Sequence, residues 1–336
     1  MMDLISDCVL LKIFNWLEIP VLAKCSQVSH NWRRVAYDSE LWMDVDLCPF
    51  RWKLDENLII RLISTRLKPL LRKLNLTSFS LTPKLFSELA TSCPHLQSLI
   101  LENVNFIGFC NYTNNNNQQL QDETITAYTF PSNLHHLDIR YSSGDPTAYE
   151  VITDNLTNLR SIGITNSLLA HVSNVKIIKN LRNIQMLDFS HCNLLYDATL
   201  VLLATFCTQL TSLSLNHCNN VRGHDLSLII EACSELKALS FSGTSLDDAS
   251  LIQCDWKRIN LEELDISWCR NITERGLLQV LPLLDKLIYL RLCSCGYGHA
   301  ITDGVLQILW GHQTLQLLDV RLVEKKTHDV WNVLNF

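Results

Sequence analysis

The residues of this chain best suited to do chemistry are its cysteines and histidines. Cys293 and Cys295 stand one residue apart with His299 close behind, which resembles a fragment of a metal site. A structural zinc site needs four ligands, and no second cysteine pair is near in the sequence. His135 and His136 are adjacent, so a strand would turn them to opposite faces. The spacing therefore predicts no bound metal.

Motifs that hold phosphate groups or activate a nucleophile are not found either. The chain has neither a G-x-x-x-x-G-K loop nor a G-x-S-x-G turn. Its 10 glycines leave few of the tight turns on which catalytic loops depend. A catalytic triad assembled in space from scattered Cys, His and Asp residues stays open as an alternative. The prediction is a protein with no catalytic residues and no cofactor.

The composition of the chain argues against nucleic acid and membranes as partners. The net charge of −6 gives no basic stripe for nucleic acid. No apolar run reaches the ~18 residues of a membrane span, since three charged residues interrupt the closest segment, 277–292. The N-terminal end has no positively charged leader and contains Asp3 and Asp7, which argues against a secretory signal. The odd number of cysteines, 13, favours a reducing compartment, the cytoplasm or the nucleus.

A ten-fold L-x-x-L-x-L frame organises most of the chain. From Leu134 to Leu287 the frames begin 25 or 26 residues apart, which is the spacing of a leucine-rich repeat, a short strand followed by a helix or turn. One unit cannot bury its own apolar face, so the copies must stack into a solenoid. We therefore expect an α/β horseshoe with parallel strands on its concave face and helices outside. The frames begin at Leu71, Leu96, Leu134, Leu159, Ile184, Leu210, Leu236, Leu261, Leu287 and Leu315.

Seven of the cysteines keep fixed places in this frame, which predicts buried free thiols that behave as small hydrophobes. Three stand three residues before a frame and four stand eight residues after its start. They are Cys93, Cys207 and Cys233, then Cys192, Cys218, Cys269 and Cys295.

The first 47 residues do not fit the repeat. Four apolar residues there have the i, i+3, i+4, i+7 spacing of an amphipathic helix: Leu10, Ile13, Phe14 and Leu17. Pro20 suits the first turn of a second helix, Trp32 belongs to a third, and Trp42 is a final apolar anchor. So short a module cannot bury all of its large side chains. Part of its surface should face another protein or the first repeat.

The runs D-L-I-S-D-C-V-L-L-K-I-F-N-W-L, L-A-K-C-S-Q-V-S-H-N-W-R-R-V-A and L-W of this segment resemble an F-box. Ile5 departs from the pattern, because the family usually has Pro there. The runs that begin at Cys269 and Cys295 resemble C-x-x-(I/L)-T-D-x-G-L, the cysteine-containing repeat typical of F-box leucine-rich-repeat proteins. The two resemblances cover nearly the whole chain, so we expect a member of that family.

The resemblance implies a substrate-recognition subunit of a Skp–cullin–F-box ubiquitin ligase. The F-box would bind the Skp adaptor, which links to the cullin and RING subunits, and the repeats would hold a protein substrate near the ubiquitin thioester. A binding scaffold or inhibitor without ubiquitin transfer is the alternative, favoured if Ile5 abolishes adaptor binding. The module's own core competes for the expected adaptor contacts, of which Phe14 and Leu17 are the first choices for a shared contact. These contacts are Leu10, Ile13, Phe14, Leu17, Val28 and Trp32.

The substrate is expected on the concave face, because strand alternation sends the residues between the leucines there. Small residues make its floor: Ser161, Gly163, Ser212, Ser214, Ser240 and Ser242. Around the floor stand charged and aromatic residues of the kinds that anchor interfaces, although each one is also compatible with an ordinary solvated position. The candidate substrate residues are Asp188, His191, His217, Asp265, Trp268, Tyr289 and Arg291.

The expected domains are an F-box at 1–47, a helical joint at 48–70, repeats at 71–322 and a C-terminal cap or tail at 323–336. The step between the frames at Leu96 and Leu134 is longer than its neighbours and contains an Asn- and Gln-rich run, which predicts a loop insertion at about 105–130. The tail either caps the last repeat or crosses the concave face.

Overall fold

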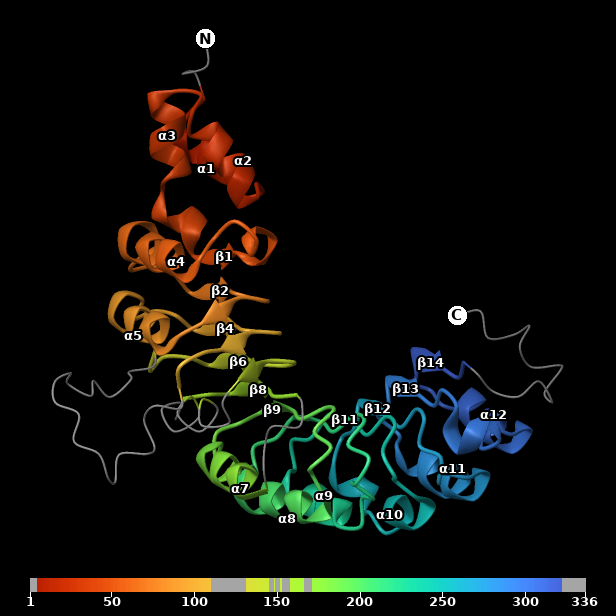
Figure 1. The fold of residues 1–336 in the computed structure, drawn as a ribbon. Helices are drawn as coiled ribbons and strands as arrows, with labels where there is room; N and C mark the ends of the chain where they lie inside the picture. Colours follow the sequence, from red (N-terminus) through yellow and green to blue (C-terminus); the bar gives the residue numbers. More distant parts are fainter. Residues whose placement is uncertain are drawn as a thin grey trace, which may run out of the picture. The chain divides into compact units, whose positions relative to one another are not determined.

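The computed structural model describes residues 5–109, 131–144, 148, 152, 158–165 and 171–321 (Figure 1). The chain divides into two compact units, Met1–Leu159 and Arg160–Phe336. In both units short parallel strands alternate with helices or turns, so the predicted fold class is confirmed: α/β, with an N-terminal helical module followed by stacked repeats. None of the described helices is both long and apolar enough to cross a membrane.

The first unit begins with a helical head, residues 7–42, made of the three predicted helices and a closing 3-10 turn. These are α1 (Asp7–Phe14), α2 (Ile19–Cys25), α3 (His30–Ala36) and η2 (Ser39–Trp42). The start of α3 is capped by Ser29, whose hydroxyl accepts a hydrogen bond from the Trp32 N–H at 3.2 Å. Ser6 occupies the cap position of α1, but its side chain makes no capping bond.

A ladder of parallel strands follows the head in the same unit. Its strands pair in register in the order β1 (Asp44–Asp46), β2 (Lys73–Asn75), β4 (Ser98–Ile100) and β6 (His136–Asp138). Three shorter strands make a second parallel sheet: β3 (Ser80–Leu81), β5 (Asn105–Phe106) and β7 (Ser143–Gly144). The connecting elements are η3 (Cys48–Phe50), α4 (Glu56–Leu62), the π-helical turn η4 (Ile63–Leu67) and α5 (Pro83–Ser92).

Strand β1 adds a repeat that the ten-frame prediction missed. Trp42, Val45 and Leu47 have the spacing of the L-x-x-L-x-L frame, and all three side chains are buried. A tryptophan in the first position hid the pattern. The strand ladder therefore begins at Asp44, within the last residues of the segment expected to be the F-box, 1–47.

The start of the predicted loop insertion also needs correction. Asn105 and Phe106 form β5 and pair with β3, and Phe109 is buried against Phe86 and Phe106. An aromatic cluster in the core therefore holds these residues in the repeat. The rest of the insertion, residues 110–130, lies outside the described residues, as does the predicted cap at 323–336.

The described part of the second unit contains seven strands that pair in register, with a row of helices beside them (Figure 1). The strands are β8 (Ser161–Gly163), β9 (Met186–Asp188), β10 (Ser212–Ser214), β11 (Ala238–Ser240), β12 (Glu263–Asp265), β13 (Tyr289–Arg291) and β14 (Leu317–Asp319). The helices are α7 (His171–Asn180), α8 (Asp197–Phe206), α9 (Leu226–Ala232), α10 (Asp248–Ile252), α11 (Glu274–Val280) and α12 (Asp303–Trp310). Single turns lie at η6 (Trp256–Arg258), η7 (Leu281–Leu283) and η8 (Cys295–Gly298).

All ten predicted frames carry a strand, at the third to fifth residue of the frame. The central residue of a strand is apolar and its side chain points to the core, as at Leu213, Leu239 and Leu290, which are at most 2% exposed. The cysteines eight residues after a frame start are buried too. Their thiols donate to a carbonyl of the preceding repeat, for example Cys218 to Phe189 at 3.1 Å. Cysteine fits there because it is small and because its S–H can donate to this carbonyl, which a methyl group in the same place could not do.

Acidic residues in the first turn of a helix tie one repeat to the next. The Asp197 carboxylate accepts from the backbone N–H groups of Arg222 and Gly223 at 2.9 and 2.8 Å. Asp248 accepts from the Thr273 N–H at 2.8 Å in the same way. These bonds satisfy backbone donors between helices and fix the spacing of successive repeats.

Candidate functional site

The head has an internal and an external apolar face on helix α1. Leu10 and Phe14 are 1% exposed and form the core with Leu22 of α2. Val9 and Ile13 lie on another face of the same helix, four residues apart, and each is 47% exposed. Leu10 and Phe14 therefore belong to the core of the head in this conformation. The adaptor contact predicted for them stays a prediction.

The other predicted adaptor residues are spread between core and surface. Leu17 and Trp32 are half-buried against the core, and Val28, in the turn between α2 and α3, is 49% exposed. The Trp32 ring meets Phe14 edge-on with centroids 5.3 Å apart. Its indole nitrogen is covered yet has no acceptor among the described residues, an arrangement that costs about 1–3 kcal/mol.

An ion pair joins the first and third helices of the head. The Arg34 guanidinium donates to the Asp7 carboxylate. This hydrogen bond lowers the pKa of Asp7 below its usual value. Both side chains are exposed, so the pair fixes the relative position of α1 and α3 more than it adds stability.

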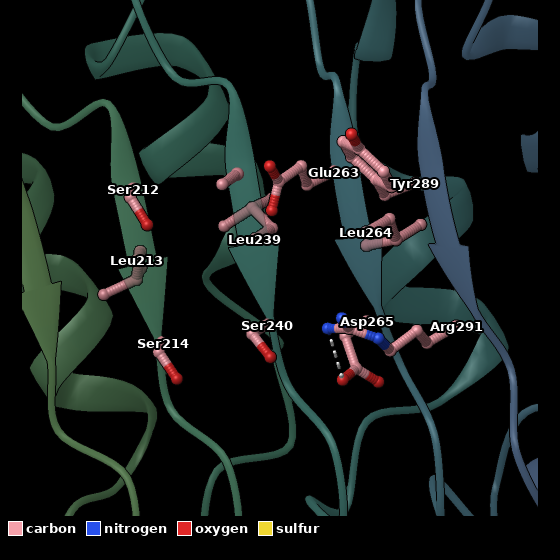
Figure 2. A pocket seen from close by; sticks show the side chains of 11 residues that line it. Ser212, Leu213, Ser214, Leu239, Ser240, Glu263, Leu264, Asp265, Tyr289 and Arg291 are labelled. Carbon is pink, nitrogen blue, oxygen red and sulfur yellow. Dashed lines mark ion pairs between the residues drawn. The ribbon is translucent and has the colours of Figure 1, made fainter. Parts of the chain in front are cut away.

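A shallow hollow lies on the strand face of the second unit, and Figure 2 shows its lining. This strand-face hollow measures about 100 Å³. The side chains of Ser212, Ser214 and Ser240 lie on its small-residue side. Charged and aromatic side chains stand on the other: Glu263, Asp265, Tyr289 and Arg291. The hollow therefore contains three of the predicted substrate residues, and an ion pair of 3.8 Å links Arg291 to Asp265.

Two of the predicted substrate residues also have a structural task at the ends of their strands. The Asp188 carboxylate accepts from the Ser190 N–H at 3.0 Å, and Asp265 accepts from the Ser267 N–H at 3.0 Å. These are Asx turns, which stop the strand and start the return of the chain. A substitution at either position would disturb the turn as well as any bound partner.

The expected polar floor is partly covered. Ser161 and Ser242 are 9% and 8% exposed, so they do not face a partner, and the prediction is wrong for them. Ser242 comes after a strand of only three residues, where the chain has already turned. The equivalent Ser267 shows the consequence, because its hydroxyl accepts from the Cys293 N–H of the next repeat at 3.1 Å. The floor that remains accessible is the serine side of the strand-face hollow.

One turn position, seven residues after each frame start, has a left-handed backbone in repeat after repeat. Its N–H donates to a carbonyl of the next repeat, as from His217 to Ser242 at 2.7 Å and from Trp268 to Cys293 at 2.7 Å. The stacking of the repeats therefore fixes this conformation whatever residue is present. Bulky residues are strained in it. The described members are Ser78, Asn103, Tyr141, His191, His217, Gly243, Trp268 and Ser294.

Large rings at this position line a second recess, the turn-edge groove, of about 610 Å³. His217 and Trp268 come from the turn position, and the His191 ring stacks on His217 with centroids 4.6 Å apart. Burial lowers the pKa of His217, and the neighbouring His191 lowers it further. The complete lining is His217, Asn219, Gly243, Thr244, Ser245, Trp268, Arg270, Asn271 and Tyr297.

Five of the seven predicted substrate residues thus fall into two groups, and Asp188 and His191 line neither recess. Asp265, Tyr289 and Arg291 line the strand-face hollow, while His217 and Trp268 line the turn-edge groove. Tyr297 and Arg270 were not predicted. The signal available for Tyr297 was its place between two glycines, Gly296 and Gly298, in a chain with only 10 glycines. In the described part of the chain no three His, Cys, Asp or Glu side chains gather as a metal site.

Comparison with known proteins defines the class first. Residues 7–48 match the family model described as F-box-like, and strand-bearing leucine-rich repeats follow that segment. The N-terminal segment is therefore similar to an F-box, and it is followed by strand-bearing repeats.

Curated relatives narrow the family. The chain is 36% identical over 103 residues to F-box/LRR-repeat protein 12 of Homo sapiens, an alignment that covers 29% of this chain and 32% of the relative. It is 35% identical over 107 residues to the Bos taurus protein of that name, covering 30% of this chain and 33% of the relative. The chain thus spans about a third of the length of the curated relatives it matches. With the F-box-like match, this similarity supports the F-box/leucine-rich-repeat family.

A solved structure shares the fold over most of the chain. It is a chain of the crystal structure of the Rad7 and Elc1 complex in yeast, with a TM-score of 0.50 and 18% sequence identity. The superposition covers 95% of this chain and 90% of that one.

Proposed function

We propose that this protein is the substrate-recognition subunit of a Skp–cullin–F-box ubiquitin ligase. The head binds the Skp adaptor, and the exposed side chains of the repeats bind the protein to be ubiquitinated. The chain contributes proximity, because it raises the effective concentration of a substrate lysine near the ubiquitin thioester. It provides no residue that makes or breaks a bond.

The observation that carries the proposal is the exposed aliphatic surface of the F-box-like segment. The head already has a core of its own, built on Leu10, Phe14 and Leu22. It nevertheless leaves Ile13 and Val28 about half exposed, at 47% and 49%. Covering such side chains is favourable by about 25 cal/mol for each Å² of apolar surface. A partner with an apolar groove or helix face would supply that cover.

Co-purification with the Skp adaptor tests the proposal. Ile13→Asp and Val28→Asp place a charge on the exposed surface and leave the core residues intact. Val201→Asp is the matched control, since Val201 is an exposed valine of helix α8, at 39%, in the repeats. We expect the wild type and Val201→Asp to capture the adaptor, and the two head variants to lose it without a change in melting temperature.

The opposite results would decide against the proposal. If the folded head variants capture the adaptor as well as the wild type, the contact is elsewhere. If the folded wild type captures none, a binding scaffold without ubiquitin transfer becomes the better account.

A further inference from the structure

The turn-edge groove concentrates the three residue types that most often anchor protein interfaces, Trp, Tyr and Arg. Trp268 is 47% exposed and Tyr297 is 65% exposed, although both are large rings. Both also have a left-handed backbone, with φ of 60° and 58°. At the turn position of Trp268 three other repeats have the smaller Ser78, Asn103 or Ser294, so the turn is formed without a ring there. The stacking of the repeats requires the left-handed turn at Trp268, but it does not require an exposed ring on that turn.

The far wall of the groove is held in place by a close approach of two backbones. Gly296 donates its N–H to the Cys269 carbonyl at 3.0 Å. A Cβ at Gly296 would lie 2.4 Å from the Ile272 oxygen, so only glycine fits there. The next residue, Tyr297, is thereby fixed beside Arg270, whose guanidinium carbon lies 5.4 Å from the ring centroid.

The charge of the groove has one sign. Arg270 is its single residue with a permanent charge, and none of the nine lining residues is acidic. The guanidinium contacts Tyr297 and forms no ion pair with any described residue. A guanidinium stacked on a ring keeps its N–H donors in the plane, where they suit a carboxylate. The strand-face hollow differs, because Arg291 there already faces Asp265.

Backbone and amide hydrogen bonds make the floor rigid. The Ser245 hydroxyl donates to the Asn219 carbonyl at 2.7 Å, and the Asn271 amide donates to the Ser245 carbonyl at 3.2 Å. Gly243 keeps one side open, because a Cβ at that position would lie 2.5 Å from Nδ1 of His217. The groove therefore exists before any partner arrives, which lowers the cost of ordering on binding.

We propose that the turn-edge groove is the docking site for an acidic peptide segment that carries an aromatic residue. The aromatic side chain packs against Trp268 and Tyr297, and a neighbouring Asp or Glu pairs with Arg270. That the segment belongs to a ubiquitination substrate rests on the proposed function. The preference of the groove for an acidic peptide with an aromatic residue does not depend on the proposed function.

Display selection of random, unmodified peptides on the purified full chain, without the adaptor, tests the proposal. The variants are Arg270→Glu, which reverses the charge, and Trp268→Ser, which introduces the residue found at the same turn in two other repeats. Arg275→Glu is the matched control, because it makes the same charge change at an exposed arginine of helix α11 that does not line the groove. Melting temperatures of all four proteins show that each is folded.

We expect the wild type to enrich peptides with Asp or Glu beside an aromatic residue. An enriched peptide, made synthetically, should bind Arg270→Glu and Trp268→Ser about 30-fold more weakly, the loss of one interface anchor. Arg275→Glu should bind it within about 3-fold of the wild type. The proposal is overturned if no peptide is enriched, if the enriched peptides lack acidic residues, or if Arg275→Glu weakens binding as much as Arg270→Glu. The adaptor is absent from this experiment, so a failure to find peptide binding does not affect the result of the adaptor experiment. Equally, a failure of adaptor binding does not affect the peptide result.

Discussion

The helical head and the repeats of the second unit build their cores from different interactions and expose different kinds of side chain. The head packs a few large side chains, such as Phe14 against Trp32, and leaves aliphatic Ile13 and Val28 exposed. The repeats reuse one set of backbone bonds and buried thiols, and they expose rings and charges such as Trp268 and Arg270. The head thus suits a partner with an apolar face. The repeats suit a partner recognised through aromatic and ionic contacts.

The largest difference between the two regions should appear at alkaline pH. Burial raises the pKa of Cys233 and Cys269 to about 11, and that of Cys207, Cys218 and Cys254 to about 12. Free thiols in the unfolded chain ionise near pH 9, so above that pH the unfolded repeats release protons that the folded repeats retain. Stability from these thiols is therefore complete below pH 9 and is lost as the pH rises toward 12.

A tenfold change in the proton affinity of one thiol corresponds to about 1.4 kcal/mol, so the five thiols together should unfold the repeats before pH 12. Melting temperature against pH measures this loss. A Cys207→Ala, Cys233→Ala variant should show a shallower decline. The same decline in both proteins would show that the buried thiols do not cause it.

The next largest effect should come from the core of the head. Phe14→Ala removes a ring that is 1% exposed and should lower the free energy of unfolding by about 3–5 kcal/mol. Ile13→Ala, one residue away and 47% exposed, should cost under about 1 kcal/mol. Urea unfolding followed by far-UV circular dichroism compares the two. Equal losses would contradict the division of helix α1 into an internal and an external face.

A smaller effect is expected at the left-handed turns of the repeats. Gly243→Ala places a Cβ 2.5 Å from Nδ1 of His217 on a backbone with φ of 68°. The variant should be about 1–2 kcal/mol less stable, the cost of a left-handed L-residue. Trp268→Gly relieves the same strain and should change stability by less than about 1 kcal/mol. Chemical denaturation of both variants checks the pair, and a tolerated Gly243→Ala would show that the turn is not strained.

The smallest expected change is at Trp32, whose buried indole nitrogen has no acceptor in the described part of the chain. Trp32→Phe removes the unpaired donor and keeps a ring beside Phe14, so stability should hold within about 1 kcal/mol or rise. Trp32→Ala, which removes the ring as well, should cost more than about 2 kcal/mol. Thermal unfolding separates them. A loss with Phe as large as that with Ala would mean that the indole N–H has a partner after all.

The sequence predicted the repeats well because their signal is a period. A spacing of 25 or 26 residues fixes which leucines face the core, and all ten frames became strands. It failed at β1, where Trp42 replaces the first leucine of the frame. The spacing also could not separate the buried face of α1 from its exposed face. Leu10, Ile13 and Phe14 all fit one helical stripe, but packing buries only Leu10 and Phe14.

The turn-edge groove was the part least accessible from sequence. Trp268 was predicted as an exposed edge residue, but its neighbours Arg270 and Tyr297 were not. Tyr297 reaches the groove only because Gly296 lets one repeat approach the Ile272 carbonyl of the repeat before it. That contact depends on the stacking of two left-handed turns, which no spacing rule within a single repeat describes.

The central claim is that adaptor and substrate use separate surfaces, one on the head and one on the repeats. Amide hydrogen exchange of the full chain, with and without the Skp adaptor, tests it most directly. The adaptor should slow exchange in residues 7–28 and leave exchange unchanged in residues 212–300. Slower exchange around Trp268 and Arg270, or none in the head despite saturating adaptor, would contradict the account.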